Sequence, residues 1–410
     1  MRFKSVVDKT ALKHINEQVI AAAKRERDLR LLMLKQGGYM VESFHYDPSI
    51  EKLTDVTALL KLLASRGLAL AAHGHAQQVM KLGEEIPPAS LTPESRLALA
   101  YAAYLLARNA TAMDHLRMCK EADFAGDDQK ALHALLEPTL RRSMGLLSAS
   151  DLLDAVRRVE RSYPDAVPTI YARLERLRHE GLRGDDAGPS DAARQIVASL
   201  QARGSSWAAL AAQASFVWLE LRFHRLQHEF LEQVTLFRVT EALGVADKTA
   251  DHRAAGAVVL TEDYRAWLND FEVALKVADG LKLDLVLAEG LYVFETCTIQ
   301  DTLQSDKVVP STPELAKGRQ GRLERTLQRL DLAGEKFHRA HAIEQELRAK
   351  MAAVEAFWLL DRKEEARKLA AKIAAGASEN GLPELLARAS AIVAGGSPVA
   401  PFDALPSMFE

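Results

Sequence analysis

Apolar residues recur every three or four positions along most of the chain, which is the period of an amphipathic α-helix. In the first such segment, Leu12, Ile15 and Val19 follow this spacing, and the pair Gly37 and Gly38 ends it. From about residue 54 the pattern divides into shorter segments. It predicts helices at 55–65, 68–82, 93–108, 110–122, 129–144, 151–162 and 168–180.

The second half begins after a run, 181–190, that contains three glycines and a proline and has no apolar face, as expected of an internal boundary. The segment 206–243 then lacks Gly and Pro and keeps one apolar stripe. It predicts a helix of about 55 Å at 1.5 Å per residue, either the spine of a bundle or a kinked pair. A weak stretch at 246–256 closes it, and further helices are predicted at 262–278, 314–332, 335–360, 363–374 and 383–393.

The segment 281–299 fits two structures. Leu281, Leu283, Leu285 and Leu287 alternate as in a strand, but the same residues fit a helix that continues through Phe294. No other segment of comparable quality could pair with a strand, so we expect a helix. The chain therefore predicts an all-α protein of stacked antiparallel helical hairpins, a repeat-like superhelix that could include a long-helix bundle in the middle.

Four regions follow from this pattern. They are an N-terminal long helix and connection at 1–48, a hairpin array at 49–181, a second array with the long central helix at 190–394, and a tail at 395–410. The tail carries Phe402, Leu405, Met408 and Phe409 beyond a flexible exit. We expect it to fold back on its own superhelix, and a short linear motif for a partner is the alternative.

Composition excludes some classes of protein. Of the 410 residues 48% are apolar and 27% charged, so wholesale disorder is excluded. The 53 Lys and Arg against 56 Asp and Glu give a net charge of −3, which excludes polyanion binding by bulk charge but not a local patch. A secreted disulfide framework needs more cysteines, at closer spacing, than Cys119 and Cys297. We expect both to be small buried residues in a reducing compartment, and a reactive thiol is the alternative. A charged N-terminus and the lack of a long apolar stretch predict a cytoplasmic protein that does not span a membrane.

Residues 356–373 resemble the middle of a tetratricopeptide repeat. Phe357 late in one helix is followed nine positions later by Ala366 in the next, and 103–119 is a weaker second match. In that family the small residue allows a close helix crossing, and the aromatic ring fills the space beside it. The resemblance implies stacked helical hairpins that bind peptides or partner proteins in a concave groove.

Several polar residues could carry chemistry on one face of the long segment 206–243. Glu220, His224, His228 and Glu232 lie at successive steps of four, and His224 with His228 could chelate a transition metal. The alternative is a polar flank of histidines bonded to glutamates. A second group starts with Glu335 and His338, an E-x-x-H spacing, and we expect His341 and Glu344 to continue on the same side. Carboxylate-bridged bundles need two such motifs and two further Glu, and the predicted helices contain one copy.

Arg222 and His228 have five residues between them, as do Arg173 and His179. This spacing resembles the R-x(4–6)-H element of helical ribonucleases of the HEPN type. The resemblance implies that Arg steadies phosphate charge while His moves a proton.

A basic ridge could supply a binding surface on the segment 314–332. It consists of Lys317 and the four arginines Arg319, Arg322, Arg325 and Arg329. Such a row could meet an acidic helix or a phosphate backbone, and a solvated face is the simpler alternative. We predict a non-catalytic scaffold, an adaptor or regulator, that binds a protein or peptide and needs no cofactor. The alternative is a ribonuclease using Arg222 and His228; nucleic acid on the ridge is less favoured, and a homo-oligomer stays open.

Overall fold

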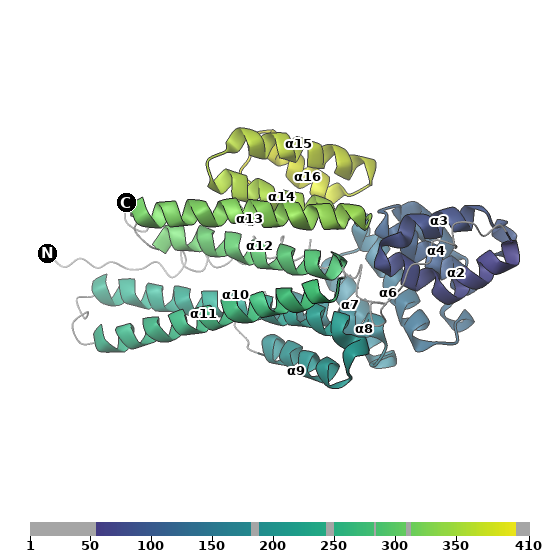
Figure 1. Cartoon of the computed structure of the whole chain (residues 1–410), viewed down its shortest axis with the longest axis horizontal. Coiled ribbons are helices and arrows are strands. Elements are labelled where there is room, and N and C mark those ends of the chain that lie inside the picture. The colour runs from purple at the N-terminus through teal and green to yellow at the C-terminus, as the bar shows by residue number, and fades with distance from the viewer. Residues whose placement is uncertain (1–54, 182–187, 243–249, 283, 309–312, 399–410) are drawn as a thin grey trace.

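The computed structural model describes residues 55–181, 188–242, 250–282, 284–308 and 313–398. Within these ranges the chain forms fifteen α-helices, α2 to α16, and no strand (Figure 1). Consecutive helices pack against each other as stacked hairpins, so the predicted all-α fold is confirmed. The predicted N-terminal helix at 1–48 and the tail residues 399–410 lie outside the described residues.

Of the seven N-terminal helices that the structure describes, the first five surround one apolar core that includes Leu59, Leu97, Tyr101 and Leu136, and the last two pack in separate clusters. Their bounds are α2 Val56–Leu70, α3 Ala76–Glu84, α4 Pro93–Leu105, α5 Asn109–Arg117, α6 Asp127–Ser143, α7 Ala149–Ser162 and α8 Val167–Gly181. The predicted break between 65 and 68 is wrong. Instead α2 continues through a π-helical turn, Ala71–His75, into α3. The helix continues because Gly67 packs against the Ala98 side chain of α4, and Leu68 and Leu70 are then buried.

The middle of the molecule is a bundle of long helices. Their bounds are α9 Gly188–Ala202, α10 Ala208–Ala242, α11 Ala250–Gly280 and α12 Asp284–Val308. The 35 residues of α10 are unbroken, so the long segment is a spine of about 52 Å and not a kinked pair. The sequence predicts that the stretch 246–256 ends the long helix and separates it from the next. This prediction is wrong for its later residues, because α11 already begins at Ala250. Helix α12 confirms a helix from position 284 onward, whereas Leu281 and Lys282 form the turn before it, with φ 54° at Lys282.

Aromatic residues hold this bundle together. Trp267 of α11 is fully buried, and its indole N–H donates to the Leu219 carbonyl of α10 at 2.7 Å. The rings of Phe223, Phe271 and Phe294 lie within 4.8–5.8 Å of the Trp267 ring. Contacts of this kind between three helices supply much of the apolar burial that stabilises a bundle.

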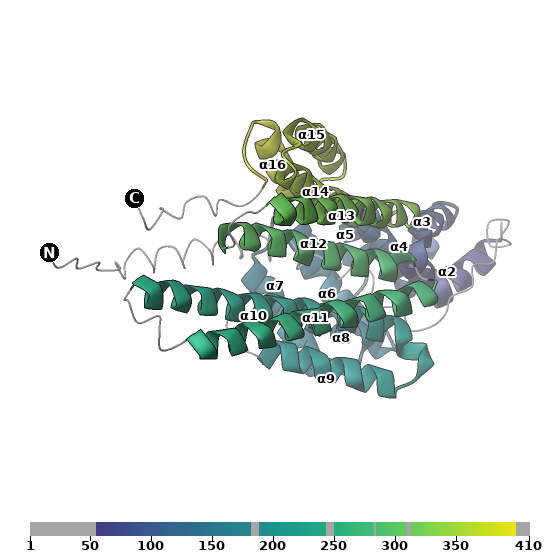
Figure 2. The same ribbon diagram turned by 60° about the vertical axis from the view of Figure 1, so that its left-hand side comes forward.

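The last helices form successive hairpins, α13 Pro313–Arg339, α14 Ile343–Leu359, α15 Lys363–Glu379 and α16 Pro383–Val393. Figure 2 shows α12 and α13 between α14–α16 on one side and α10–α11 on the other. The same tight turn joins each pair, with a positive φ at His341 (53°), Asp361 (58°) and Gly381 (62°). The predicted bounds 314–332 and 335–360 therefore differ from the structure, in which α13 runs on to Arg339.

Each turn is closed in the same way. The backbone N–H of the residue after the positive φ donates to the carbonyl five positions earlier, at 2.8–2.9 Å. This is the Schellman arrangement, which satisfies the free carbonyls at a helix end. The turn recurs at intervals of 20 residues (361 − 341 and 381 − 361). The two helices that lie between these turns, α14 and α15, therefore have the same length, 17 residues each.

The first and last helices meet. Gly74, in the π-helical turn with φ +92°, lies against the Ala340 backbone at the α13–α14 turn. Arg142 of α6 also pairs with Glu384 of α16 at 2.8 Å. These contacts bring segments more than 200 residues apart into one packed body.

Two further expectations concern composition. Cys119 and Cys297 are both buried free cysteines, as predicted. None of the helices that the structure describes combines the length and the apolarity that crossing a membrane requires.

Candidate functional site

The histidine face predicted on α10 is only partly described. Glu220 points into the protein and is buried, and the His224 ring lies 5.7 Å from the Phe223 ring, edge-on. The side chains of His228 and Glu232 lie outside the described residues. Among the side chains that are described, no group of three or more His, Cys, Asp or Glu could hold a metal ion.

The residues of the ribonuclease alternative are in different surroundings. Arg222 lies 2.6 Å from the Asp270 carboxylate of α11, and its guanidinium lies over the Trp218 ring at 6.0 Å. On α8, Arg173 is exposed whereas His179 is buried, so these two side chains do not share a surface.

The second predicted group, which starts at Glu335, is interrupted. Glu335 and His338 lie in the last turns of α13, but His341 lies in the positive-φ turn that separates α13 from α14. The expectation that His341 and Glu344 continue on one helix face is therefore wrong. His338 instead lies 2.9 Å from the Glu346 carboxylate of α14.

The basic ridge of α13 partly faces acidic residues of the same chain. Arg322 lies 3.4 Å from Asp301 of α12. Arg329 lies 3.0 Å from Glu272 of α11 and 3.3 Å from Glu295 of α12. These two arginines thus tie α13 to its neighbours in the bundle.

The other members of the ridge are Lys317, Arg319 and Arg325. Lys317 and Arg325 are exposed, and Arg319 is partly exposed. Lys317 and Arg319 lie on the first turns of α13, where positions 316, 318, 320 and 321 are exposed as well, and Arg325 lies nearer the middle of this helix. The N-terminal half of α13 therefore carries a basic surface.

The sequence did not predict a charged cluster at the centre of the molecule. Arg178 of α8 is 2% exposed and lies 2.7 Å from Glu175 on the same helix. It also lies 2.7 Å from Glu220 of α10 and 3.5 Å from Glu289 of α12. Three buried carboxylates from three helices thus surround one guanidinium. We name these four side chains the Arg178 cluster.

The charges of the cluster do not balance, and this shifts its proton equilibria. Burial raises the pKa of Glu175 to about 7; Arg178 opposes the shift, and Glu289 and Glu220 add to it. Burial acts to lower the pKa of Arg178, but the three carboxylates outweigh it and hold that pKa well above its usual value. Oε2 of Glu175 is buried and accepts no hydrogen bond from the described residues. Glu175 therefore titrates near neutral pH, whereas Arg178 stays charged.

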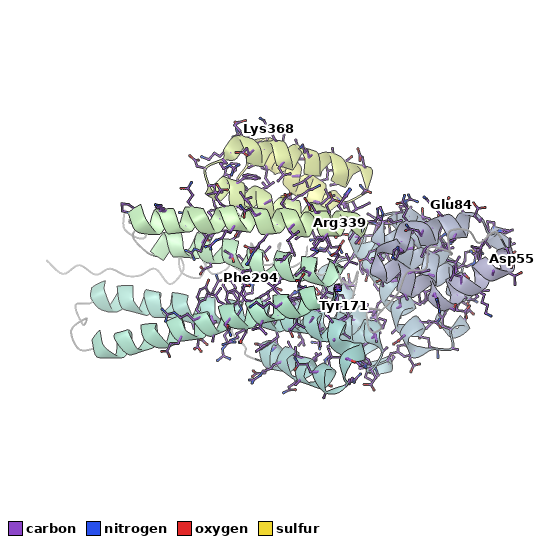
Figure 3. The ribbon with its side chains drawn as sticks, in the orientation of Figure 1. Asp55, Glu84, Tyr171, Phe294, Arg339 and Lys368 are labelled. Carbon is purple, nitrogen blue, oxygen red and sulfur yellow. The ribbon has the colours of Figure 1, made fainter. Side chains whose placement is uncertain are left out.

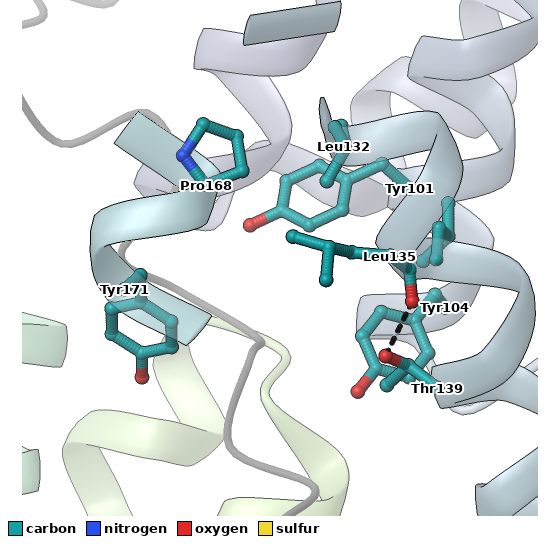
Figure 4. A pocket seen from close by; sticks show the side chains of 8 residues that line it. Tyr101, Tyr104, Leu132, Leu135, Thr139, Pro168 and Tyr171 are labelled. Atoms are coloured by element: carbon teal, nitrogen blue, oxygen red, sulfur yellow. Dashed lines mark hydrogen bonds between the residues drawn. The ribbon is translucent and has the colours of Figure 1, made fainter. Parts of the chain in front are cut away.

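Buried tyrosines lie next to the cluster. Tyr171 of α8, labelled in Figure 3, lines a narrow pocket with Tyr101 and Tyr104 of α4 (Figure 4). Thr139 on the pocket wall donates its hydroxyl to the Leu135 carbonyl at 2.6 Å. Burial, and then the charges of Glu175 and Glu289, raise the pKa of Tyr171 well above its usual value. These phenols therefore stay protonated.

A second buried ion pair lies on α14, where Arg348 contacts Glu344 at 2.7 Å. Both residues influence Tyr104, which is raised in pKa chiefly by burial and then by Glu344. Buried polar groups therefore line the junction between α4, α8 and α14. The signal in the sequence was weak, since it consists of single acidic residues, such as Glu220 and Glu289, inside apolar helix segments.

Comparison of the chain with models of known protein families gave no match, and comparison with curated proteins gave none.

Proposed function

We propose that the chain is a non-catalytic helical scaffold that binds a protein or peptide partner and acts as an adaptor or regulator. The observation that supports this function is the stack of α13 to α16, in which one turn recurs at His341, Asp361 and Gly381. Arrays of antiparallel hairpins present long helix faces, which suit extended peptides and protein surfaces.

Packing between α14 and α15 supports the proposed relation to tetratricopeptide repeats. Ala366 is fully buried, and Phe357 packs at the edge of the same apolar cluster. The Arg362 guanidinium lies 4.6 Å over the Phe357 ring. A small residue facing an aromatic one is what a close crossing of two helices requires.

The surface that we propose for the partner lies on the N-terminal half of α13, where Lys317 and Arg325 are exposed. Arg322 and Arg329 of the predicted ridge instead pair with carboxylates of α12 and α11, so they hold α13 against these two helices. Guanidinium groups bind carboxylates with two parallel hydrogen bonds. An acidic segment is therefore the partner chemistry that this surface would select.

Affinity capture from the native host with the full chain tests this proposal. The charge-reversed variant Lys317→Glu/Arg325→Glu is compared with Lys372→Glu, which changes an exposed lysine of α15. We expect one partner to be retained by the wild type and by the control and lost from the double variant, and the purified partner to bind directly. A partner retained equally by all three contradicts the α13 surface, and the lack of any reproducible partner contradicts the scaffold.

The ribonuclease alternative is tested in parallel. Purified protein incubated with labelled RNA should leave the RNA intact. Cleavage that disappears in His228→Ala and in Arg222→Ala would replace the scaffold with a helical ribonuclease.

A further inference from the structure

The Arg178 cluster places an uneven number of charges out of contact with water. If all four groups were ionised, three carboxylates would face one guanidinium, with two negative charges in excess. Excess buried charge is costly, and a buried group normally takes up a proton instead. Oε2 of Glu175 accepts no hydrogen bond within the described part of the chain. A proton on that oxygen would displace no existing donor.

Other polar and charged groups lie on the helices around the cluster. Within the cluster's surroundings α4 contributes Tyr101, which interacts with Tyr171. On α7, Glu160 pairs with Arg176 at 2.8 Å, and this pair is half-buried. From α6, Asp128 accepts the Val167 N–H at 2.9 Å, two turns before Glu175.

His179 follows Arg178 on α8 and is also buried. Histidine titrates in the same pH range as a carboxyl group of raised pKa. An experiment on the cluster must therefore separate the two groups.

We propose that the Arg178 cluster is a proton-dependent joint, in which a proton on Glu175 holds α8, α10 and α12 together and loss of that proton loosens their junction. This goes beyond the scaffold proposed above and does not depend on its partner. Burial and the neighbouring carboxylates raise the pKa of Glu175 from 4.5 to about 7. The folded state thus binds the proton more tightly than the unfolded state. The stabilisation is complete below pH 4.5 and is lost as the pH rises through about 7.

Substitution of Glu175 by Gln tests the joint, because Gln keeps the shape of the protonated side chain. The matched control is Glu364→Gln, since Glu364 also lies three residues before an arginine, Arg367, but on the surface. Between pH 5 and 8 the melting temperature of the wild type and of the control should fall by roughly 3 °C. That fall should disappear in Glu175→Gln, and at pH 8 this variant should melt above the wild type.

Hydrogen exchange locates the effect. After correction for intrinsic rates, amides of α8 should exchange about tenfold faster at pH 8 than at pH 5 in the wild type, and equally at both in Glu175→Gln. Equal pH profiles for the wild type and Glu175→Gln would overturn the proposal. So would a profile that persists in Glu175→Gln and disappears in His179→Gln.

A second variant keeps the test decisive if Glu175→Gln does not fold. The charge of Glu289 raises the pKa of Glu175. Glu289→Gln should therefore move the midpoint of the stability loss to lower pH. A midpoint that stays in place or moves to higher pH would also overturn the joint.

Discussion

Gly290 of α12 lies directly against the ring of Phe216 of α10. A Cβ atom at position 290 would stand 2.3 Å from Cζ of Phe216, well inside the closest contact that two carbon atoms allow. Phe216 is fully buried, and its ring stacks on Phe271 of α11 with 5.7 Å between the ring centres. The missing side chain of Gly290 thus sets how closely α10 and α12 pack.

Gly290→Ala should destabilise the protein although alanine is the better helix former. Overpacking a filled core costs about 1–3 kcal/mol, which outweighs the roughly 1 kcal/mol gained in helix propensity. Gly321→Ala is the control, because a Cβ there meets nothing within 4 Å. In urea denaturation the free energy of unfolding should fall for Gly290→Ala and rise slightly for Gly321→Ala. A shift in the same direction for both would contradict the close approach of Gly290 to Phe216.

The helical content of the chain could be predicted because it follows from local periodicity. The predicted segment 383–393 agrees with α16, Pro383–Val393, and most of the segment 281–299 is helical, from position 284 onward, despite its alternating leucines. The continuation of α2 through Gly67 could not be predicted in this way. It depends on the contact of Gly67 with Ala98, which belongs to another helix.

The Arg178 cluster was not predicted for the same reason. Glu220 and Glu289 lie 69 residues apart (289 − 220) and meet Arg178 only after three helices pack together. In the sequence each is a single acidic residue among apolar ones, which periodicity alone assigns to a solvent-facing position. The histidine and arginine spacings were easier to see because they lie within one helix.

Ala366→Trp should strongly destabilise the α14–α15 hairpin. Ala366 is fully buried, so a large ring would force the two helices apart at a cost of about 1–3 kcal/mol or more. The control is Ala371→Trp, because Ala371 lies on the exposed face of α15. Thermal unfolding should show a lower melting temperature for Ala366→Trp and little change for Ala371→Trp. Equal melting temperatures would mean that Ala366 does not occupy a close helix crossing.

Cys119 should react slowly with iodoacetamide while the protein is folded. Burial raises the pKa of its thiol to about 11, so about one molecule in a thousand carries the reactive thiolate at pH 8. The rate of alkylation should rise roughly tenfold per pH unit between pH 8 and 10. Mass spectrometry of the modified peptide measures it, and protein unfolded in guanidinium chloride is the control. Alkylation of the folded protein at pH 8 as fast as that of the unfolded chain would contradict the burial of this thiol.

Arg178→Met should be the most damaging of these substitutions, because it leaves three buried carboxylates without their cation. Removal of one partner from a buried ion pair costs about 3–5 kcal/mol. Arg367→Met is the matched control, since each arginine pairs with a glutamate three residues earlier. The Arg178 and Glu175 side chains are 2% and 3% exposed, whereas those of Arg367 and Glu364 are 40% and 78% exposed. A surface pair of this kind contributes at most about 1 kcal/mol.

The pH dependence of Arg178→Met separates lost charge from lost packing. Arg178 lowers the pKa of Glu175, so its removal should raise that pKa above about 7. The folded variant would then bind protons that the unfolded chain releases near pH 4.5, and its stability should fall as the pH rises. Urea denaturation at pH 5 and pH 8 should show a loss, relative to wild type, that is larger at pH 8. An equal loss in the free energy of unfolding at pH 5 and pH 8 would mean that Arg178 stabilises the junction by packing alone. The loss of an apolar packing contact does not change with pH.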